Sequence, residues 1–142
     1  MIRLLTIEDY EVIYELWQSA EGMGLRSLDD SKNGIEKFII RNPKTNFIAL
    51  NDDEVTGVIL SGHDGRRGYI YHAVVSPKYR GKNIGKSLVD HVIESQIGEG
   101  INKICLVVFK DNEPGNKFWE AIGFDNRDDL IFRNISINDL NL

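Results

Sequence analysis

Residues 75–86 read VSPKYRGKNIGK, and this stretch decides the fold that we expect. The β-branched run before it predicts a strand, and the periodic apolar residues after it predict a helix. Its residues 78–86 hold four positive side chains and no acidic one. Gly81, Asn83 and Gly85 tolerate backbone angles that most residues avoid. Successive N–H groups of such a turn can point into one concavity at the positive end of the helix, which favours a phosphate or pyrophosphate as the guest.

The residues on either side of this loop predict alternating strands and helices. We expect strands at Ile2–Leu5, Thr45–Leu50, Val55–His63, Tyr69–Val75, Ile101–Phe109 and Leu130–Ile135. We expect helices from Thr6 to about Ala20, from near Asp30 to Arg41, along the apolar stripe Ile84–Ile97, and around Gly115–Ile122. Short turns of glycine, asparagine and aspartate join the second, third and fourth strands, which indicates an antiparallel meander.

The fifth strand, Ile101–Phe109, is apolar on both alternations, which is typical of a strand covered on both faces. Its cysteine, Cys105, is therefore expected to be a small core residue. A helix joins the strand before the basic loop to this fifth strand, so we expect the two to be parallel neighbours. The pattern predicts one mixed α/β domain spanning residues 1–142.

Composition limits the partners of the chain. The 142 residues carry a net charge of −5, which argues against general attraction to nucleic acid or to anionic lipid. No apolar run reaches the roughly 18 to 20 residues that span a bilayer. Cys105 has no partner for an internal disulfide, and Glu8 and Asp9 interrupt the segment that would be apolar in a signal peptide. We therefore expect a cytoplasmic protein without a membrane or nucleic-acid partner. No His or Cys spacing indicates a metal site.

The charge is unevenly distributed. Residues 78–86 contribute +4, and the remaining 13 positive and 22 negative residues give −9. Two phosphate-binding motifs come close without matching: Arg80 stands where a Walker A loop needs its first glycine, and Gly81 and Gly85 are too far apart for G-x-G-x-x-G. An exposed basic loop that only caps a helix is the alternative, but the position between strand and helix favours an anion site.

Two stretches of the chain match the paired motifs of one family. Val75-Ser76-Pro77 precedes Arg80-Gly81-Lys82-Asn83-Ile84-Gly85, as in a strand ending V-x-P followed by Q/R-x-x-G-x-G/A. Residues 112–124, NEPGNKFWEAIGF, are similar to N-x-x-A-x-x-F-Y-x-x-x-G-F. Together these stretches resemble the GNAT superfamily of acetyl-CoA-dependent N-acetyltransferases, with the look of its small YpeA-like and RimI-like bacterial members. The resemblance covers most of the chain.

The resemblance implies a central, mostly antiparallel sheet with about four flanking helices, in which the parallel fourth and fifth strands splay apart around a coenzyme. It implies acetyl-CoA as cosubstrate, and direct attack on its thioester by a primary amine of a small molecule or a protein N-terminus. The cofactor-binding residues that it implies are Val74, Val75, Arg80, Gly81, Lys82, Asn83, Ile84, Gly85, Lys86, Asn112 and Trp119. The two valines would offer backbone groups to the pantetheine arm, and the loop would hold the pyrophosphate.

Two positions depart from the family pattern. Asn83 replaces a glycine, and asparagine tolerates the left-handed conformation better than most residues. Trp119 stands where many members carry a tyrosine that protonates the departing thiolate, and an indole N–H is not a useful general acid. A thiol ionises near a pKa of about 8.5, so its thiolate needs less help to leave than an alkoxide. We therefore favour an acyltransferase. A non-catalytic acyl-CoA-binding module of the same fold is the alternative, and a nucleotide-binding protein is a third reading.

The catalytic residues are harder to name. Tyr71 and Tyr69 fall at or near the position of the family's usual base, and they are our catalytic candidates. Their pKa values near 10 suit them to donate a proton or to order a water. His72 is more basic, but strand alternation directs it to the opposite face unless a bulge intervenes.

The resemblance places the segment from Glu21 to Ser31 over the acceptor. Glu21, Asp29 and Asp30 could then hold a cationic amine, and Arg26 could hold a carboxylate. The alternative is helix capping by Asp29 or Asp30, with the other side chains on a solvated face. The identity of the acceptor stays open at this point, and so does a homodimer.

Overall fold

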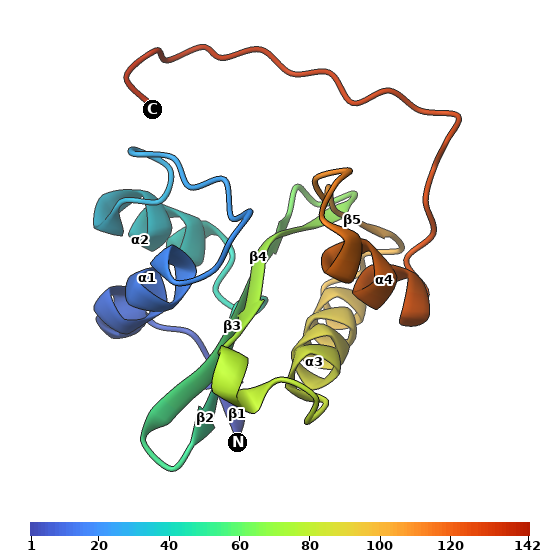
Figure 1. Ribbon diagram of the computed structural model, residues 1–142. Helices are drawn as coiled ribbons and strands as arrows, with labels where there is room; N and C mark the ends of the chain where they lie inside the picture. The colour runs from blue at the N-terminus through green and yellow to red at the C-terminus, as the bar shows by residue number, and fades with distance from the viewer.

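The computed structural model describes all 142 residues and has a five-stranded sheet with helices on both faces (Figure 1). The strands, in their order across the sheet, are β1 (Ile2–Leu4), β2 (Phe47–Asn51), β3 (Glu54–His63), β4 (Gly68–Val75) and β5 (Ile104–Cys105). The helices are α1 (Tyr10–Gln18), α2 (Lys32–Arg41), α3 (Ile84–Gly98) and α4 (Glu113–Ala121), with short 3-10 turns η1 (Ile7–Asp9) and η2 (Pro77–Tyr79). β1 to β4 pair antiparallel and β4 pairs parallel with β5, which confirms the expected fold class.

The sheet separates two apolar layers. Alternation along β3 sends Val58 and Leu60 to one face and Ile59 to the other. The first face packs against α1 and α2, where Trp17 is fully buried, and the second packs against α3, where Val92 is fully buried. Figure 1 shows α1 and α2 on one side of the sheet and α3 and α4 on the other. No helix is long and apolar enough to cross a membrane.

Local sequence signals set the ends of the first helices. The Thr6 N–H donates to Asp9 Oδ2 at 2.9 Å where the first helical segment begins, and Arg3 also pairs with Asp9 at 2.9 Å. α2 ends at Arg41, and the next residue, Asn42, leaves the helical region at φ −126° and ψ 72°, as expected for the residue before Pro43.

β5 is shorter and more exposed than the sequence predicts. The strand expected over Ile101–Phe109 is reduced to Ile104–Cys105. Ile104 and Leu106 pack toward α3, whereas Cys105 is exposed and Val107 and Phe109 are each more than half exposed. The expectations of a strand covered on both faces and of a core cysteine are therefore wrong. The cause is that only the loop between α1 and α2 approaches this face, at Phe109, and leaves Cys105 and Val107 uncovered.

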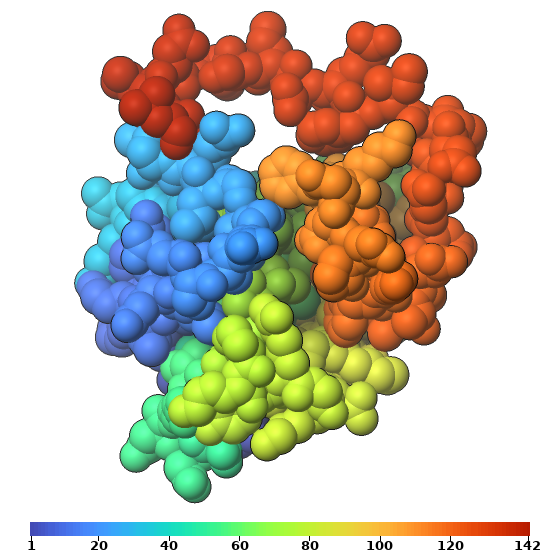
Figure 2. Space-filling view, in the orientation of Figure 1, coloured from blue at the N-terminus to red at the C-terminus, as the bar shows by residue number.

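Residues 125–142 form an extended segment, which we call the C-terminal strap, and not the strand expected at Leu130–Ile135. Figure 2 shows the strap arching over the molecule, and its side chains are left uncovered, with Ile131 78% and Ile135 84% exposed. Its end is fixed on the loop between α1 and α2, where Asn141 Oδ1 accepts the N–H groups of residues 28 and 29 at 3.0 Å. The strand prediction is wrong because the strap is anchored at this loop and pairs with no sheet edge.

Candidate active site

The basic loop begins where β4 ends and leads into α3. Gly81 and Asn83 adopt the left-handed conformation, with φ of 78° and 63°. The backbone N–H groups of residues 81–86 donate no hydrogen bond within the protein, and those of residues 84–86 open the fifteen-residue helix α3. A row of free amides at a helix N-terminus is a ready site for a phosphate group. A Cβ atom added at Gly81 would meet nothing within 4 Å, so the loop leaves room for such a group.

The positive side chains of this loop are not equivalent. Lys78 pairs with Glu54 at 2.8 Å, and this hydrogen bond lowers the pKa of the Glu54 carboxyl. Lys86 pairs with Asp90 at 2.9 Å. Arg80 and Lys82 have no carboxylate partner. These last two side chains therefore supply the unneutralised charge beside the free amides.

Gly85 lies close to α4. A Cβ atom there would lie 3.2 Å from the ring of Phe118 on α4. α4 thus packs on the start of α3, and a side chain at this position would require the Phe118 ring to shift by a few tenths of an ångström.

β4 and β5 are paired only at their beginnings, Gly68 with Ile104 and Tyr69 with Cys105. Beyond this point β4 keeps β3 as its only partner. Alternate backbone groups of its second half therefore face the side from which β5 has diverged. Val74 and Val75, which the sequence implies as coenzyme contacts, lie in this half.

A bulge in β4 lies at the same place. Residues 59–61 of β3 face residues 70–73 of β4, so β4 carries one extra residue there. The bulge turns Tyr71 and His72 toward the same face of the sheet. Tyr71 then lies against α2, and the His72 ring lies 5.0 Å from that of Trp17 on α1. The bulge therefore interrupts the strand alternation that would otherwise place these two side chains on opposite faces of the sheet.

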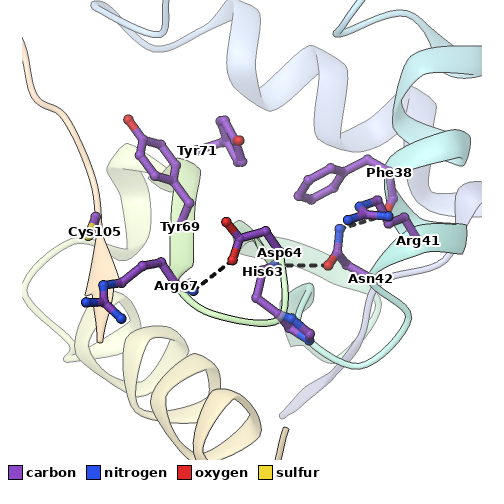
Figure 3. Close-up of a pocket in the computed structure, with 11 residues that line it drawn as sticks. Phe38, Arg41, Asn42, His63, Asp64, Arg67, Tyr69, Tyr71 and Cys105 are labelled. Carbon is purple, nitrogen blue, oxygen red and sulfur yellow. Dashed lines mark hydrogen bonds between the residues drawn. The ribbon is translucent and has the colours of Figure 1, made fainter. Parts of the chain in front are cut away.

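A cavity of about 390 Å³, which we call the α2 cavity, opens beside the divergence of β4 and β5 (Figure 3). Its walls come from α2, from the β3–β4 turn and from the first residues of β4 and β5. It is lined by Phe38, Arg41, Asn42, Gly62, His63, Asp64, Arg67, Gly68, Tyr69, Tyr71 and Cys105. Its volume lies in the range of small-molecule sites, roughly 300 to 1,000 Å³.

Both catalytic candidates stand in the α2 cavity (Figure 3). The rings of Tyr69 and Tyr71 are 4.6 Å apart, and Phe38 meets Tyr71 edge-on at 5.5 Å. Burial raises the pKa of the Tyr69 phenol above its usual value, and the neighbouring Tyr71 adds to this. Tyr69 is thus protonated at neutral pH and suits the role of a donor, not of a base.

Asp64 and two arginines give the cavity its charge. The Asp64 Oδ1 atom accepts the backbone N–H groups of Arg67 and Arg66, both at 2.8 Å, and these bonds lower the pKa of its carboxyl. The Arg41 guanidinium makes no hydrogen bond or ion pair, and the Arg67 guanidinium donates only to the carbonyl oxygen of Arg66, at 3.3 Å. These residues were not predicted as part of a site, because residues 64–68, DGRRG, have the composition of a turn. The two adjacent arginines of that turn are the signal that could have marked them.

His72 and Asp30 form a buried pair beside the cavity wall. The Asp30 carboxylate accepts from His72 Nε2 and from the Arg26 N–H, both at 2.7 Å. The side chains are only 12% and 7% exposed. An ionised carboxylate can only accept, so this contact places the proton of a neutral His72 on Nε2. The pair fastens the loop between α1 and α2 to β4.

The acceptor residues expected from sequence lie on that loop but outside the α2 cavity. Glu21 is exposed. The backbone N–H of Arg26, and not its side chain, donates to the Asp30 carboxylate. Asp29 accepts a hydrogen bond from Asn141 Nδ2 of the strap at 2.8 Å. The structure therefore does not bring Glu21, Arg26 and Asp29 together with Tyr69 and Tyr71.

The last two implied coenzyme contacts belong to α4. Asn112 caps this helix by accepting the Gly115 N–H at 3.1 Å. Trp119 is half-buried between Phe118 and Phe124, each with its ring centroid 5.0 Å away. Trp119 therefore holds α4 against the sheet through aromatic packing.

Known proteins resemble this chain in sequence and in fold. The model of the acetyltransferase (GNAT) family matches residues 10–124. An acetyltransferase of Sodalis glossinidius (strain morsitans) is 31% identical over 130 residues, which cover 92% of this chain and 90% of that protein.

Two solved structures share the fold. One is the PaiA N-acetyltransferase from Thermoplasma acidophilum in complex with coenzyme A, with a TM-score of 0.74, 23% identity, and coverage of 85% of this chain and 86% of that one. The other is an aminoglycoside acetyltransferase from an uncultured soil metagenomic sample in complex with sisomicin, with a TM-score of 0.76, 17% identity, and coverage of 97% and 96%. The family match over most of the chain, the related acetyltransferase and the shared fold lead to one conclusion: this chain is an acyltransferase that belongs to the GNAT acetyltransferase family.

Proposed function

We propose that this protein moves an acetyl group from acetyl-CoA to a primary amine of a small molecule or of a protein N-terminus. The observation that carries the proposal is the row of free backbone N–H groups over residues 81–86, which lies directly after the half of β4 that has no β5 partner. Acetyl-CoA is the cosubstrate: a dianionic pyrophosphate suits the free amides, and an extended pantetheine arm suits an unpaired strand.

The residues of the chain divide this work. The amides of residues 81–86 hold the pyrophosphate, and Arg80 and Lys82 add charge that no carboxylate neutralises. Val74 and Val75 offer main-chain groups to the pantetheine arm. Bound acetyl-CoA supplies an activated acetyl thioester.

The chain assists the attack of a neutral amine mainly by positioning. Backbone N–H groups of β4 that face away from β3 stabilise negative charge on the carbonyl oxygen. Tyr71 and Tyr69 are the side chains placed to donate a proton or to order a water, and the raised pKa of Tyr69 suits the donor role. Trp119 has no acidic hydroxyl, so thiolate departure depends on the low pKa of the thiol itself, about 8.5.

The α2 cavity is the acceptor site in this proposal, because it meets the sheet where β4 and β5 diverge. An amine acceptor is supported by the two proteins of the same fold, an N-acetyltransferase and an aminoglycoside acetyltransferase. The exposed free thiol of Cys105 suits a reducing compartment, and we place the protein in the cytoplasm.

Thermal-shift measurements with acetyl-CoA, CoA and ATP test the donor. A ligand at 100 times its Kd raises the unfolding free energy by about 2.7 kcal/mol. We expect stabilisation by acetyl-CoA and CoA. Stabilisation by ATP without any effect of acetyl-CoA would overturn the proposal. Release of free thiol in the presence of an amine panel then tests transfer, and binding of acetyl-CoA without thiol release would instead indicate a non-catalytic acyl-CoA-binding module.

A further inference from the structure

The charges of the α2 cavity indicate which amines it accepts. We propose, building on the acetyl transfer proposed above, that the acceptor carries an anionic group, a carboxylate or a phosphate. Arg41 or Arg67, which line opposite sides of the cavity (Figure 3), holds this group while the amine lies near Tyr71. The acceptor is thus a small amine with an acidic end, and not a polycation.

The position of the cavity fixes the direction of the acceptor. One end of the cavity contains Tyr71, beside the point where β4 and β5 diverge, and the reacting amine has to lie at this end. The end of α2 contributes Arg41 on one side of the cavity, and the β3–β4 turn contributes Asp64 and, on the opposite side, Arg67 (Figure 3). The part of the acceptor that does not react therefore extends toward one of these two arginines.

The side-chain groups of these charged residues that are still free to bond are mostly donors. The Arg41 guanidinium has no hydrogen-bond partner, and the Arg67 guanidinium donates one N–H to a backbone carbonyl oxygen. A guanidinium offers five N–H donors in a planar fork that fits a carboxylate or a phosphate. Asp64 is the only acidic residue that lines the cavity, and its Oδ1 atom already accepts two backbone N–H groups.

The formal charge points the same way. The chain as a whole carries −5, but the two arginines and one aspartate of the cavity sum to +1. A polycationic amine would meet two guanidinium groups there without a spare carboxylate for each of its charges. An acidic end on the acceptor would instead be attracted, and Phe38 and the two tyrosines would cover its carbon chain.

Matched pairs of amines provide the test. Glycine, β-alanine and γ-aminobutyrate are each compared with their amides, and O-phosphoethanolamine is compared with ethanolamine, with thiol release from acetyl-CoA as the readout. We expect at least one anionic member to exceed its neutral partner by about 10- to 100-fold in kcat/KM, the worth of a hydrogen bond to a charged group. The amino acids and the phosphate distinguish the two kinds of anion. Equal rates within every pair, or faster acetylation of spermidine than of all the anionic amines, would overturn the inference.

Substitutions assign the preference to the cavity. At least one of Arg41→Gln and Arg67→Gln should raise KM for the anionic amine and leave KM for its neutral partner unchanged. Arg66→Gln is the matched control, because Arg66 lies on the same turn and does not line the cavity. Asp64→Asn keeps an oxygen that can accept the turn N–H groups, so it should lower KM for the anionic amine by removing a repulsive charge. A higher KM for that amine in Asp64→Asn, or a preference that survives both arginine substitutions, contradicts the proposed contacts.

Binding of products separates this inference from the proposed function. Calorimetry with CoA present should detect N-acetylglycine or its longer homologues and not the corresponding amides. If acetyl-CoA binds but no anionic amine or product does, the acceptor inference fails and the acetyl-transfer proposal stands. If acetyl-CoA itself does not bind, the proposed function fails first.

Discussion

Asp30→Ala should be among the most damaging single changes outside the apolar core. The side chain is 7% exposed, and its carboxylate accepts two hydrogen bonds at 2.7 Å, from His72 Nε2 and from the Arg26 N–H. A hydrogen bond to a charged group contributes roughly 1.5 to 3 kcal/mol, and removing one partner of a buried pair costs roughly 3 to 5 kcal/mol. We therefore expect a loss of about 3 to 5 kcal/mol. That is a large fraction of the roughly 5 to 15 kcal/mol that stabilises a typical domain.

Urea denaturation followed by tryptophan fluorescence measures this loss, because Trp17 packs on the His72 ring. Asp29→Ala is the matched control, since Asp29 is exposed and its side chain bonds only to Asn141 of the strap. This control should stay within about 0.5 kcal/mol of the unsubstituted protein. If Asp30→Ala loses no more than Asp29→Ala, the buried pair does not hold the α1–α2 loop on β4 and the reasoning is refuted.

Three further predictions concern charge and the strap. Arg80→Gln should weaken acetyl-CoA binding about tenfold, as measured by calorimetry. Lys78→Gln should change this affinity little, because Lys78 already pairs with a carboxylate. Equal effects of the two substitutions would contradict the conclusion that Arg80 supplies the unneutralised charge of the loop. The hydrogen bond from Arg3 lowers the pKa of the Asp9 carboxyl in the folded protein. The stabilisation by this carboxylate is therefore complete above the unfolded pKa of about 4, and it is lost as the pH falls through the lowered native pKa. Asp9→Asn should then flatten the acid limb of the stability profile, and an unchanged limb would count against that pair. Asn141→Ala should speed proteolysis within residues 125–142 while urea unfolding of the remainder is unchanged, and equal cleavage of both proteins would show that this side chain does not anchor the strap.

The order of the elements could be predicted because each has a strong local signal. The turns of Asn, Asp and Gly set the meander from β2 to β4, and Pro43 ends α2 at the expected residue. The free amides of residues 81–86 also follow from glycine and asparagine at positions that need a positive φ. Signals of this kind depend on a few neighbouring residues, so they can be recognised without knowledge of the tertiary structure.

The bulge in β4 could not be predicted, because tyrosine and histidine suit either face of a strand. Only the register against β3 shows that Tyr71 and His72 share a face. The partner of His72 is equally hidden, since Asp30 is 42 residues away in the chain. The α2 cavity combines residues of α2, a turn and two strands, so its charged end appears only when the chain has folded.

For a related reason, the apolar patterns after α3 led to one strand that was predicted too long and one that does not form. Residues such as Val107 and Ile135 have high β propensity, but propensity does not provide a pairing partner. β5 stops at Cys105 and the strap stays extended, so the same composition yields an exposed strand end and an exposed segment.

The strap also bears on the order of folding. The backbone bond between the Ser27 N–H and the Leu142 carbonyl oxygen joins residues 115 apart, and a contact of such sequence separation closes a long loop at high entropic cost. Both apolar layers are built from residues up to Phe124, so they can form before this loop closes. On the ribosome, where the N-terminal part emerges first, the sheet and its helices can therefore assemble while the strap is still being made. The contacts between the strap and the α1–α2 loop would then form last. The same contacts would be the first to open in the native protein.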